Sequence, residues 1–294
     1  MLISLYGHTR QNHAITPLQN FITALLANGF QVEIEKRFAS YLRRNEAMPR
    51  QCLAVNAPSP KSSLLISIGG DGTLLRAARW LKQLPLPIAG INTGHLGYLA
   101  PWTFEDAPHL LISLADRQLQ TEPRSLLRLD IKAANGETLM SQWPYALNDI
   151  AILKDNSASM ISVHTRLNGT YLTDYLADGL IISTPTGSTA YNLSAGGPIL
   201  QPTAPALALT PVAPHTLTMR PLVIQDDAII EATPSTRSGR YILSLDGDTL
   251  SLPSETPLTI QRAPFTINIV RKPADDFATT LRTKLLWGTH TIKP

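Results

Sequence analysis

The residues best suited to chemistry form the short run Gly69-Gly70-Asp71-Gly72-Thr73. This run comes directly after the apolar residues 64–68 and directly before residues 74–84, which have helical spacing. A glycine turn between a strand and a helix can bind phosphate, because three glycines allow positive φ and the helix N–H groups attract anions. A carboxylate would repel phosphates unless it accepts a proton from an attacking hydroxyl or holds a cation. The run therefore predicts phosphoryl transfer at Asp71, with a helix-capping aspartate as the alternative.

A second polar segment runs from Asp178 to Pro198 and combines many Ser and Thr residues with Tyr191 and several glycines. Hydroxyl groups both donate and accept hydrogen bonds, so the segment could bind sugar hydroxyls, a carboxamide or phosphate oxygens without adding charge. The same composition suits an exposed turn region, in which side chains bond to the nearby backbone. Composition leaves both interpretations open.

The elements that position the glycine run alternate between strands and helices before residue 102. Strands are expected at 2–6, 32–34, 64–68 and 88–91, and helices at 16–28 and 74–84. This alternation indicates βαβ units around a parallel sheet. In the second helix, Arg76 and Arg79 lie away from the apolar face. We expect both side chains to be exposed to solvent rather than to contact a phosphate.

The pattern changes after a helix expected at 104–114. From Leu126 onward, short alternating strands come with turn signals, including the candidate hairpins Asn135-Gly136 and Asn168-Gly169. Prolines at 198, 202, 205, 211 and 214 argue against a long helix or a central strand there. The expected fold is α/β plus all-β: a Rossmann-like parallel-sheet domain over residues 1–102, a β-rich, sandwich-like domain over 103–270, and a C-terminal tail over 271–294.

Five stretches, in order, resemble the NAD kinase family. They are Gly69-Gly70-Asp71-Gly72-Thr73-Leu74-Leu75, Asn92-Thr93-Gly94-His95-Leu96-Gly97-Tyr98-Leu99, Asn148-Asp149, the segment from Asp178 to Pro198, and Asp276-Phe277 followed by Leu281-Arg282-Thr283-Lys284-Leu285-Leu286-Trp287. A Gly-Gly-Asp-Gly run alone also resembles the diacylglycerol and sphingosine kinases and the phosphofructokinases. The second and fourth stretches narrow the resemblance to one family.

The resemblance implies a reaction. ATP, or another donor such as polyphosphate, would phosphorylate the 2′-hydroxyl of the adenosine ribose of NAD to give NADP, with Mg²⁺ or another divalent cation as cofactor. Asp71 would be the base that takes the hydroxyl proton. The resemblance also implies an NAD kinase/diacylglycerol kinase-like fold, a final helix carrying Phe277, Leu281 and Leu285 packed on the first domain, and a homodimer or homotetramer.

The other site residues follow from the same resemblance. Asn148 suits a base edge and Asp149 the hydroxyls of a ribose, although a turn or cap at a strand start is their alternative. Asp178 would contact the nicotinamide end, and Tyr191 would offer a ring face to a base. The full set of expected substrate contacts is Gly69, Gly70, Asp71, Gly72, Thr73, Asn92, Asn148, Asp149, Asp178, Thr189, Ala190, Tyr191, Asn192, Ser194 and Asp248.

Three positions depart from the usual family pattern. Asp149 stands where glutamate is usual, Leu176 where many bacterial relatives have arginine, and Asp248 where glutamine is frequent. The change at Leu176 could alter the discrimination between NAD and NADH. His8 and His95 are interpreted as ordinary loop histidines rather than phosphate contacts or metal ligands.

Composition limits the setting. The 25 basic and 22 acidic residues give a net charge of +3, too weak a field to indicate a nucleic-acid partner. One cysteine, Cys52, excludes an internal disulfide and fits a reducing cytoplasm, where it is expected to fill core space rather than act as a nucleophile. Neither a secretory signal nor a membrane span is expected.

Two other functions compete with NAD phosphorylation. A lipid kinase of the diacylglycerol type shares the glycine-aspartate turn and a β-rich second domain, but gives no reason for the hydroxyl-rich segment at 184–191. A non-catalytic NAD-binding sensor would use Asp71 only to hold ribose. Formation of NADP from NAD and ATP distinguishes the NAD kinase from both the lipid kinase and the sensor.

Overall fold

The chain forms two compact units in a computed structural model that describes residues 1–9, 14–94, 97–132, 138–139, 143–155, 159–273 and 276–288. The first unit comprises Met1–Pro123 and Ile267–Pro294, and the second comprises Arg124–Thr266. The chain passes from one unit to the other within two strands, β6 (Thr121–Lys132) and β18 (Leu258–Val270). The second unit is therefore inserted between two parts of the first.

The first unit is built on a parallel sheet in the order β3-β2-β1-β4-β5. Its strands are β1 (Leu2–Gly7), β2 (Gln31–Glu35), β3 (Leu53–Val55), β4 (Ser62–Ile68) and β5 (Ile88–Ile91). The end of β18 continues the sheet, because Ile269 pairs with Ile88 in parallel. The expected Rossmann-like parallel sheet is confirmed.

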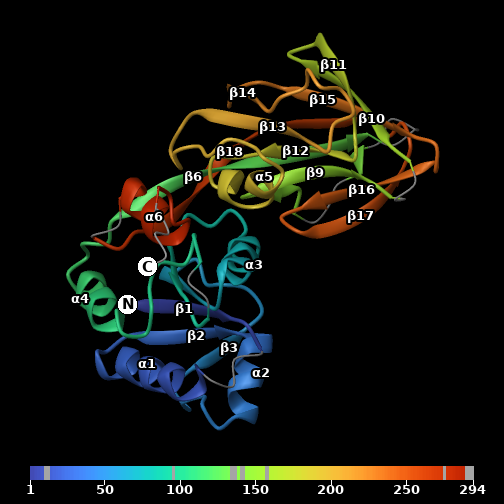
Figure 1. Ribbon diagram of the computed structural model, residues 1–294. Helices are drawn as coiled ribbons and strands as arrows, with labels where there is room; N and C mark the ends of the chain where they lie inside the picture. Colours follow the sequence, from blue (N-terminus) through green and yellow to red (C-terminus); the bar gives the residue numbers. More distant parts are fainter. Residues whose placement is uncertain are drawn as a thin grey trace, which may run out of the picture. The chain divides into compact units, whose positions relative to one another are not determined.

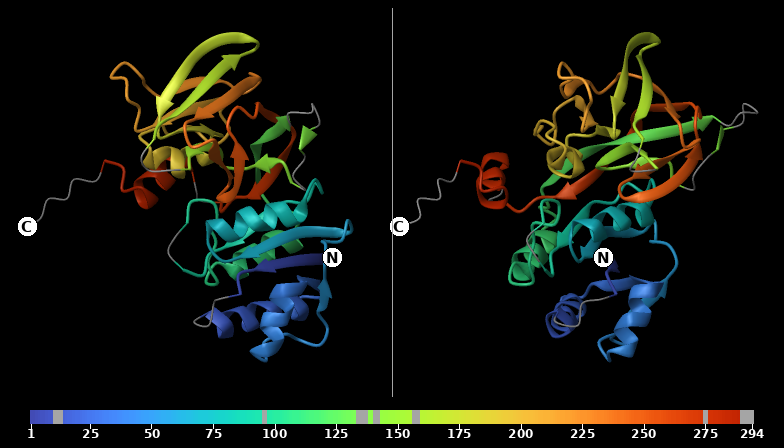
Figure 2. Two further views of the ribbon diagram at one scale, coloured as in Figure 1. Left: turned by 90° about the vertical axis from the view of Figure 1, so that its right-hand side faces the viewer. Right: turned by 45° about the vertical axis from the view of Figure 1, so that its right-hand side comes forward.

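Helices cover both faces of this sheet (Figures 1 and 2). They are α1 (Ile15–Ala27), α2 (Lys36–Arg44), α3 (Asp71–Leu81) and α4 (Ala107–Ala115). The unit also contains α6 (Phe277–Lys284), which has no buried residue. The connections β1-α1-β2 and β4-α3-β5 run in opposite directions across the sheet, so right-handed crossovers place α1 and α3 on opposite faces. Strand β4 is buried on both faces as a result.

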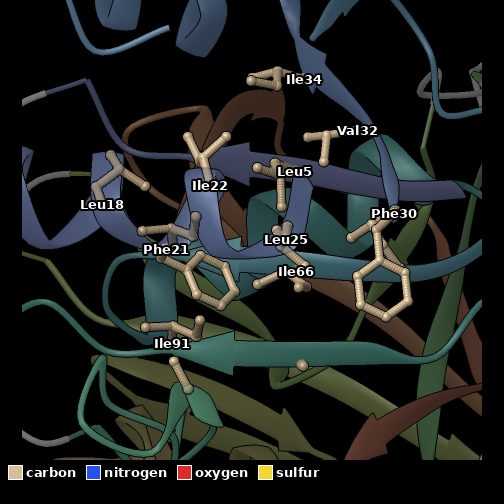
Figure 3. Close-up of a cluster of buried hydrophobic side chains, with 14 of the residues drawn as sticks. Leu5, Leu18, Phe21, Ile22, Leu25, Phe30, Val32, Ile34, Ile66 and Ile91 are labelled. Carbon is tan, nitrogen blue, oxygen red and sulfur yellow. The ribbon is translucent and has the colours of Figure 1, made fainter. Parts of the chain in front are cut away.

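A hydrophobic core fills the space between the sheet and helices α1, α2 and α4. Leu18, Phe21, Ile22 and Leu25 form the buried stripe of α1, with the spacing of one helical face. Figure 3 shows these side chains meeting Leu5 of β1 and its neighbours from β2, β4 and β5. Burial of this stripe holds α1 against the sheet.

The second unit contains a six-stranded antiparallel sheet in the order β14-β13-β12-β9-β16-β17. Its strands are β9 (Asp149–Lys154), β12 (Gly179–Ser183), β13 (Ala206–Val212), β14 (Leu222–Gln225), β16 (Arg240–Leu245) and β17 (Asp248–Pro253). A short 3₁₀ turn, η2 (Gly187–Thr189), and helix α5 (Tyr191–Ser194) follow β12. The hydroxyl-rich segment thus lies partly on β12 and partly on these turns.

A second layer of strands completes this unit. It contains the antiparallel run β11-β10-β15-β18, and β6 lies beside β18 with β7 and β8 beside β6. The further strands are β7 (Thr138–Leu139), β8 (Tyr145–Ala146), β10 (Ile161–Leu167), β11 (Thr170–Ala177) and β15 (Ile230–Thr236). Apolar side chains from both layers form one core, as in a β-sandwich. The expected β-rich, sandwich-like fold is confirmed.

Several local expectations need correction. Helix α2 and strand β3 were not expected, and α3 begins at Asp71 rather than at residue 74. The exclusion of a central strand near the prolines is wrong at β13, which lies between β12 and β14. Pro211 is tolerated because β14 pairs only with residues up to Leu209, so the proline needs no N–H on that side.

Two other expectations, a turn at Asn168-Gly169 and a buried Cys52, are confirmed. Asn168 and Gly169, both with positive φ, form the two-residue turn between β10 and β11, whereas Asn135-Gly136 lies outside the described residues. Burial raises the pKa of the Cys52 thiol to about 11, which fits a space-filling residue. Each helix in the described part of the chain is too short or too polar to cross a membrane.

Candidate active site

The glycine run follows β4 at the point where the order of the parallel strands reverses. The chain moves outward from β1 to β2 and β3 on one side, and from β4 to β5 on the other. The carboxyl ends of β1 and β4 flank this switch point, where open α/β sheets bind their ligands. His8, directly after β1, donates its backbone N–H to Ile68 O at 3.1 Å. The run therefore occupies the position that this fold favours for a ligand.

The three glycines of the run have different roles. Gly69 has a φ of +144°, and a Cβ on it would lie 2.4 Å from Thr73 Oγ1. Gly70 has a φ of −81°, and Gly72 lies within α3, so the expectation of positive φ is wrong for these two. A Cβ on Gly70 would meet nothing within 4 Å, and one on Gly72 would meet only the Arg76 guanidinium at 3.8 Å. Both leave open space at the N-terminus of α3.

The Asp71 carboxylate binds a neighbouring loop. Its Oδ2 accepts a hydrogen bond from the backbone N–H of Tyr98 at 2.6 Å, and its Oδ1 accepts from the N–H groups of Leu99 and Ala100 at 3.0 and 3.1 Å. Three consecutive N–H groups hold this half-buried carboxylate in one orientation. A carboxylate has about four lone-pair sites, so Oδ2 retains the capacity to accept another hydrogen bond.

Gly97 allows this close approach. A Cβ on Gly97 would lie 2.1 Å from Asp71 Oδ1, well inside van der Waals contact. The Gly97 carbonyl oxygen also accepts a hydrogen bond from Lys284 Nζ of α6. Within the first unit, the C-terminal helix and the Asp71 carboxylate therefore contact the same loop.

The remaining expected residues of the first unit stand around this loop. Asn92 follows β5, and its Oδ1 accepts a hydrogen bond from Gly94 N at 2.8 Å. Its backbone N–H donates to Trp102 O at 2.7 Å, so Asn92 shapes the loop that returns to Asp71. Arg76 is exposed, as expected, and donates to Thr73 Oγ1 at 3.3 Å. His95 lies outside the described residues.

In the second unit, the Asn148-Asp149 pair is held by Asp246. The Asp246 Oδ2 accepts from the N–H of Leu147 at 2.7 Å, and its Oδ1 accepts from the N–H groups of Asn148 and Asp149 at 2.7 and 3.2 Å. Asp246 and Gly247, with φ of +49° and +88°, form the tight turn between β16 and β17. The Asp246 carboxylate thus fixes the loop that carries both expected recognition residues.

The carboxyl group of Asp149 has a strongly raised pKa. Its side chain is buried, and burial followed by the charge of Asp246 raises its pKa to about 7. The neighbouring Asn148 Oδ1 is buried and has no hydrogen-bond partner among the described residues. A buried acceptor of this kind is costly unless a ligand or water satisfies it.

The hydroxyl-rich segment contacts the same loop. Thr184 donates its backbone N–H to Asn148 O at 2.9 Å and its hydroxyl to Leu147 O at 2.6 Å. A Cβ on Gly187 would lie 2.0 Å from Asn148 O, so only glycine fits there. The structure therefore brings together two stretches that are separate in the sequence, and adds Asp246 to them.

The hydroxyls themselves are mostly buried. Ser183, Thr184, Thr186 and Ser188 are at most 2% exposed. The hydroxyls of Ser183 and Ser188 donate to nearby carbonyl groups and that of Thr184 donates to Leu147 O, whereas Thr186 Oγ1 accepts from the Arg124 guanidinium at 3.2 Å. Side-chain bonds to the backbone were the sequence alternative, but the expected exposure is wrong for these four residues. The hydroxyls of Ser183, Thr184 and Ser188 satisfy backbone groups and so shape the segment.

The expected contacts beyond Ser188 divide into buried and accessible residues. Asn192 is fully buried: its amide nitrogen donates to Ser188 O and Pro198 O, and its oxygen accepts from Thr210 Oγ1 at 2.6 Å. By contrast, four neighbours have exposed or half-exposed side chains, namely Thr189, Ala190, Tyr191 and Ser194. Tyr191 is 40% exposed. These four are accessible to a ligand as they stand.

Asp178 lies at the other end of β12. Ser183, the last residue of β12, pairs with Asp149, whereas Asp178 directly precedes the first residue of the strand. The rise of an extended strand places the two ends roughly 16 Å apart. Asp178 forms an ion pair with Lys154 at 2.6 Å. Within one chain, Asp178 and Asp149 therefore suit different ends of a long ligand.

Asp248 is exposed at the start of β17, opposite Leu245 in the hairpin. The sequence interpretation chose Asp248 and passed over Asp246, which makes the three backbone contacts described above. An Asp-Gly pair between two alternating apolar strands is a hairpin signal that could have directed attention to Asp246. The contacts of Gly97 and Lys154 carried no comparable local signal.

No group of three or more His, Cys, Asp or Glu side chains suited to hold a metal ion occurs among the described residues. Mg²⁺ prefers oxygen ligands and commonly binds through one or two carboxylates together with substrate phosphates and water. The single carboxylate at the glycine turn fits a cation that arrives with phosphates better than a cation held by protein ligands alone.

The sequence matches the models of two known domains and is similar to known enzymes. The model of the ATP-NAD kinase N-terminal domain matches residues 5–119, and that of the ATP-NAD kinase C-terminal domain matches residues 147–272. The NAD kinase of Flavobacterium psychrophilum is 42% identical over 291 residues, with 98% of each chain covered. The NAD kinase of Porphyromonas gingivalis is 40% identical over 287 residues, which covers 97% of this chain and 98% of the relative.

Solved structures share the fold. Yeast NADH kinase complexed with NADH has a TM-score of 0.89 at 24% identity, covering 100% of this chain and 90% of that one. An NAD kinase from Archaeoglobus fulgidus in complex with ATP has a TM-score of 0.70 at 25% identity, covering 93% and 94%. The two domain matches and the relatives above 30% identity show that the chain belongs to the ATP-NAD kinase family.

Proposed function

We propose that this protein is an NAD kinase that transfers the terminal phosphoryl group of ATP to the 2′-hydroxyl of the adenosine ribose of NAD, producing NADP. The observation that carries the mechanism is the Asp71 carboxylate, fixed at the strand switch point by three backbone N–H groups. Family membership favours this reaction over lipid phosphorylation or NAD sensing without turnover.

Asp71 is the proposed base. A ribose hydroxyl is a poor nucleophile at neutral pH, so a carboxylate within hydrogen-bond reach assists by taking its proton. The ribose oxygen forms a bond to the terminal phosphorus, the bond from that phosphorus to the leaving ADP oxygen breaks, and the proton passes to Asp71. The lone-pair capacity left on Oδ2 provides the acceptor, and the three N–H contacts fix its direction.

The rest of the turn is proposed to bind phosphate. Gly70 and Gly72 leave space at the N-terminus of α3, where backbone N–H groups and the helix dipole favour an anion. Gly69 and Thr73 form the turn itself, and Asn92 shapes the loop opposite. Mg²⁺ or another divalent cation, bound to the donor phosphates, would supply neutralisation of their charge.

The second unit is proposed to recognise the dinucleotide. Asn148 Oδ1, a buried acceptor without a partner among the described residues, suits an N–H group on a base edge. Asp149 suits ribose hydroxyls, whose hydrogen bonds would favour its charged form. Thr189, Ala190, Tyr191 and Ser194 offer accessible contacts, Asn192 supports them from inside, and Asp178 is assigned to the nicotinamide end. Asp248 remains a proposed contact with a sugar hydroxyl.

The proposal extends to the setting of the enzyme. The sequence-based bounds of 1–102, 103–270 and 271–294 are proposed for the nucleotide-binding domain, the substrate-binding domain and the tail, whereas the compact units of the structure divide between residues 123 and 124 and between residues 266 and 267. A homodimer or homotetramer in the cytoplasm is proposed, with substrate contacts shared between copies. Size-exclusion chromatography with light scattering measures the assembly directly.

The function is tested by an end-point assay of purified protein with Mg²⁺, ATP and either NAD or NADH. We expect phosphorylated dinucleotide to form, and Asp71→Asn to lower turnover by about 10² or more, the usual range for a lost general base. Asp227→Asn, which neutralises an exposed aspartate outside the proposed site, serves as the control. Near wild-type turnover of folded Asp71→Asn would remove Asp71 from the mechanism, and saturable NAD binding without any turnover would support a sensor.

A further inference from the structure

A pocket of about 570 Å³ opens in the second unit beside Asp178. Its charged and titratable lining residues are Lys154, Asp178, His215 and Arg237, and Leu176 adds an apolar wall that is 40% exposed. A volume of this size is within the range of small-molecule sites. The pocket contains the one aspartate that we assign to the nicotinamide end of the substrate, together with a lysine that has no role in the proposed reaction.

Lys154 and Asp178 are held together by both backbone and side chains. The Lys154 N–H donates to Asp178 O at 3.0 Å, and Lys154 Nζ lies 2.6 Å from Asp178 Oδ1. The two side chains are 22% and 35% exposed, so water screens the pair only in part. The register of β9 and β12 keeps the backbones that carry the two side chains next to each other.

This ion pair bears on the redox form of the substrate. The nicotinamide ring of NAD carries a positive charge, whereas the dihydronicotinamide ring of NADH is neutral. An unpaired carboxylate close to the ring would attract the oxidised form and favour it over the reduced form. A carboxylate already paired with an ammonium group has almost no net charge to offer the ring.

We propose that Lys154 determines dinucleotide specificity: by neutralising Asp178, it removes the preference that this carboxylate would otherwise give to the positively charged ring of NAD over the neutral ring of NADH. Arg237 adds a positive charge that is the same in every variant compared below, and Leu176 offers the ring an apolar surface that suits either form. This inference rests on the proposed function and on the assignment of Asp178 to the nicotinamide end.

The test compares kcat/KM for NAD with kcat/KM for NADH in each variant. Both values come from the same preparation, so their ratio is independent of the fraction of folded protein. Lys154→Met should raise the NAD-to-NADH ratio by about three- to tenfold, because it leaves the Asp178 charge unpaired in a partly screened site. Lys154→Arg keeps the charge and should leave the ratio near the wild-type value.

Two further variants assign the cause. In the double variant Lys154→Met with Asp178→Asn, the ratio should return to near the wild-type value, because positions 154 and 178 then carry no net charge, as in the wild-type ion pair, and Arg237 is unchanged. Arg262→Met breaks a similar ion pair with Asp226 in the same unit, outside the pocket, and should leave the ratio unchanged.

The outcomes separate the inference from the function on which it rests. An unchanged or lowered ratio in Lys154→Met, or a raised ratio that persists after Asp178→Asn is added, would overturn the role of Lys154 while wild-type turnover still upholds the kinase. If the wild-type protein phosphorylates neither dinucleotide, the proposed function itself fails.

Discussion

Asp71 in the first unit and Asp246 in the second form the same kind of hydrogen-bond arrangement but serve different purposes. Each carboxylate accepts hydrogen bonds from three consecutive backbone N–H groups, those of residues 98–100 and of residues 147–149. Asp71 is itself the proposed reacting group, held by a loop. Asp246 holds the loop that carries the proposed recognition residues.

The two regions also differ in what surrounds the carboxylate. Asp71 lies at the N-terminus of α3, where the helix dipole favours a negative charge. The charge of Asp246 instead acts on the buried Asp149 and contributes to its raised pKa. One arrangement stabilises the carboxylate that it positions, whereas the other fixes a loop and makes its neighbouring carboxylate harder to ionise.

The largest effect should come from disturbing the first arrangement without changing Asp71. Gly97→Ala places a Cβ where Asp71 Oδ1 now lies, 2.1 Å away, so the carboxylate or the loop must move. Because catalysis depends on the position of the base, we expect kcat to fall by about 10². Steady-state kinetics with saturating ATP and NAD measures this loss.

The chain offers a matched control in the same loop. A Cβ on Gly94 would meet nothing within 4 Å, and its φ is not in the positive region, so Gly94→Ala should stay within a few-fold of the wild-type kcat. Equal losses in Gly94→Ala and Gly97→Ala would show that the loop, and not the approach to Asp71, limits the reaction.

Much of the fold was predictable because its signals are local. The strands at β4 and β5, helix α1 and the switch to β-rich structure follow from periodicity alone. Helix α2 escaped because it is short and polar, although Phe38, Ala39, Tyr41 and Leu42 form its buried face. Strand β3 has three residues, none of them buried, and so shows no alternation. Pro211 was misjudged because the length of β14 cannot be seen from the prolines themselves.

The site was predictable only as separate stretches. The spacing of the glycine run and its flanking elements indicated Asp71 as a chemical group. The N–H donors that fix it come 27 to 29 residues later, and Asp246 comes 97 to 99 residues after the groups that it binds. Contacts over such separations depend on how the strands order themselves in a sheet, which a single sequence does not display.

A smaller effect is expected from the second arrangement. Asp246→Asn keeps a side chain that tolerates positive φ, but its amide nitrogen must face one of the three N–H donors and leave it unsatisfied. We expect a loss of about 1–3 kcal/mol in the free energy of unfolding and a KM for NAD raised several-fold. Urea unfolding and initial-rate kinetics measure the two effects.

Asp248→Asn is the comparison for that variant, because Asp248 is exposed and lies two residues away. Its unfolding free energy should stay within about 0.5 kcal/mol of the wild-type value. A KM for NAD raised more by Asp248→Asn than by Asp246→Asn would restore Asp248 as the principal recognition residue on this hairpin.

The smallest effect concerns Asp149 and depends on pH. Burial and Asp246 raise the pKa of Asp149 to about 7, above its unfolded value of about 3.9. Between these values the folded protein retains a proton that the unfolded chain has released, so this residue lowers stability progressively as pH rises from about 4 to about 7.

An amide in place of this carboxyl group would not titrate. The free energies of unfolding of wild type and Asp149→Asn in urea should therefore be most similar at pH 4 and diverge by pH 8.5, where the variant gains about 1–2 kcal/mol relative to the wild type. Asp227→Asn, which changes an exposed carboxylate, should follow the wild-type curve at both values. If the free energies of unfolding of wild type and Asp149→Asn change with pH in parallel, Asp149 ionises with an ordinary pKa. The charge of Asp246 would then be neutralised by its hydrogen bonds to the three N–H groups and would not act on Asp149.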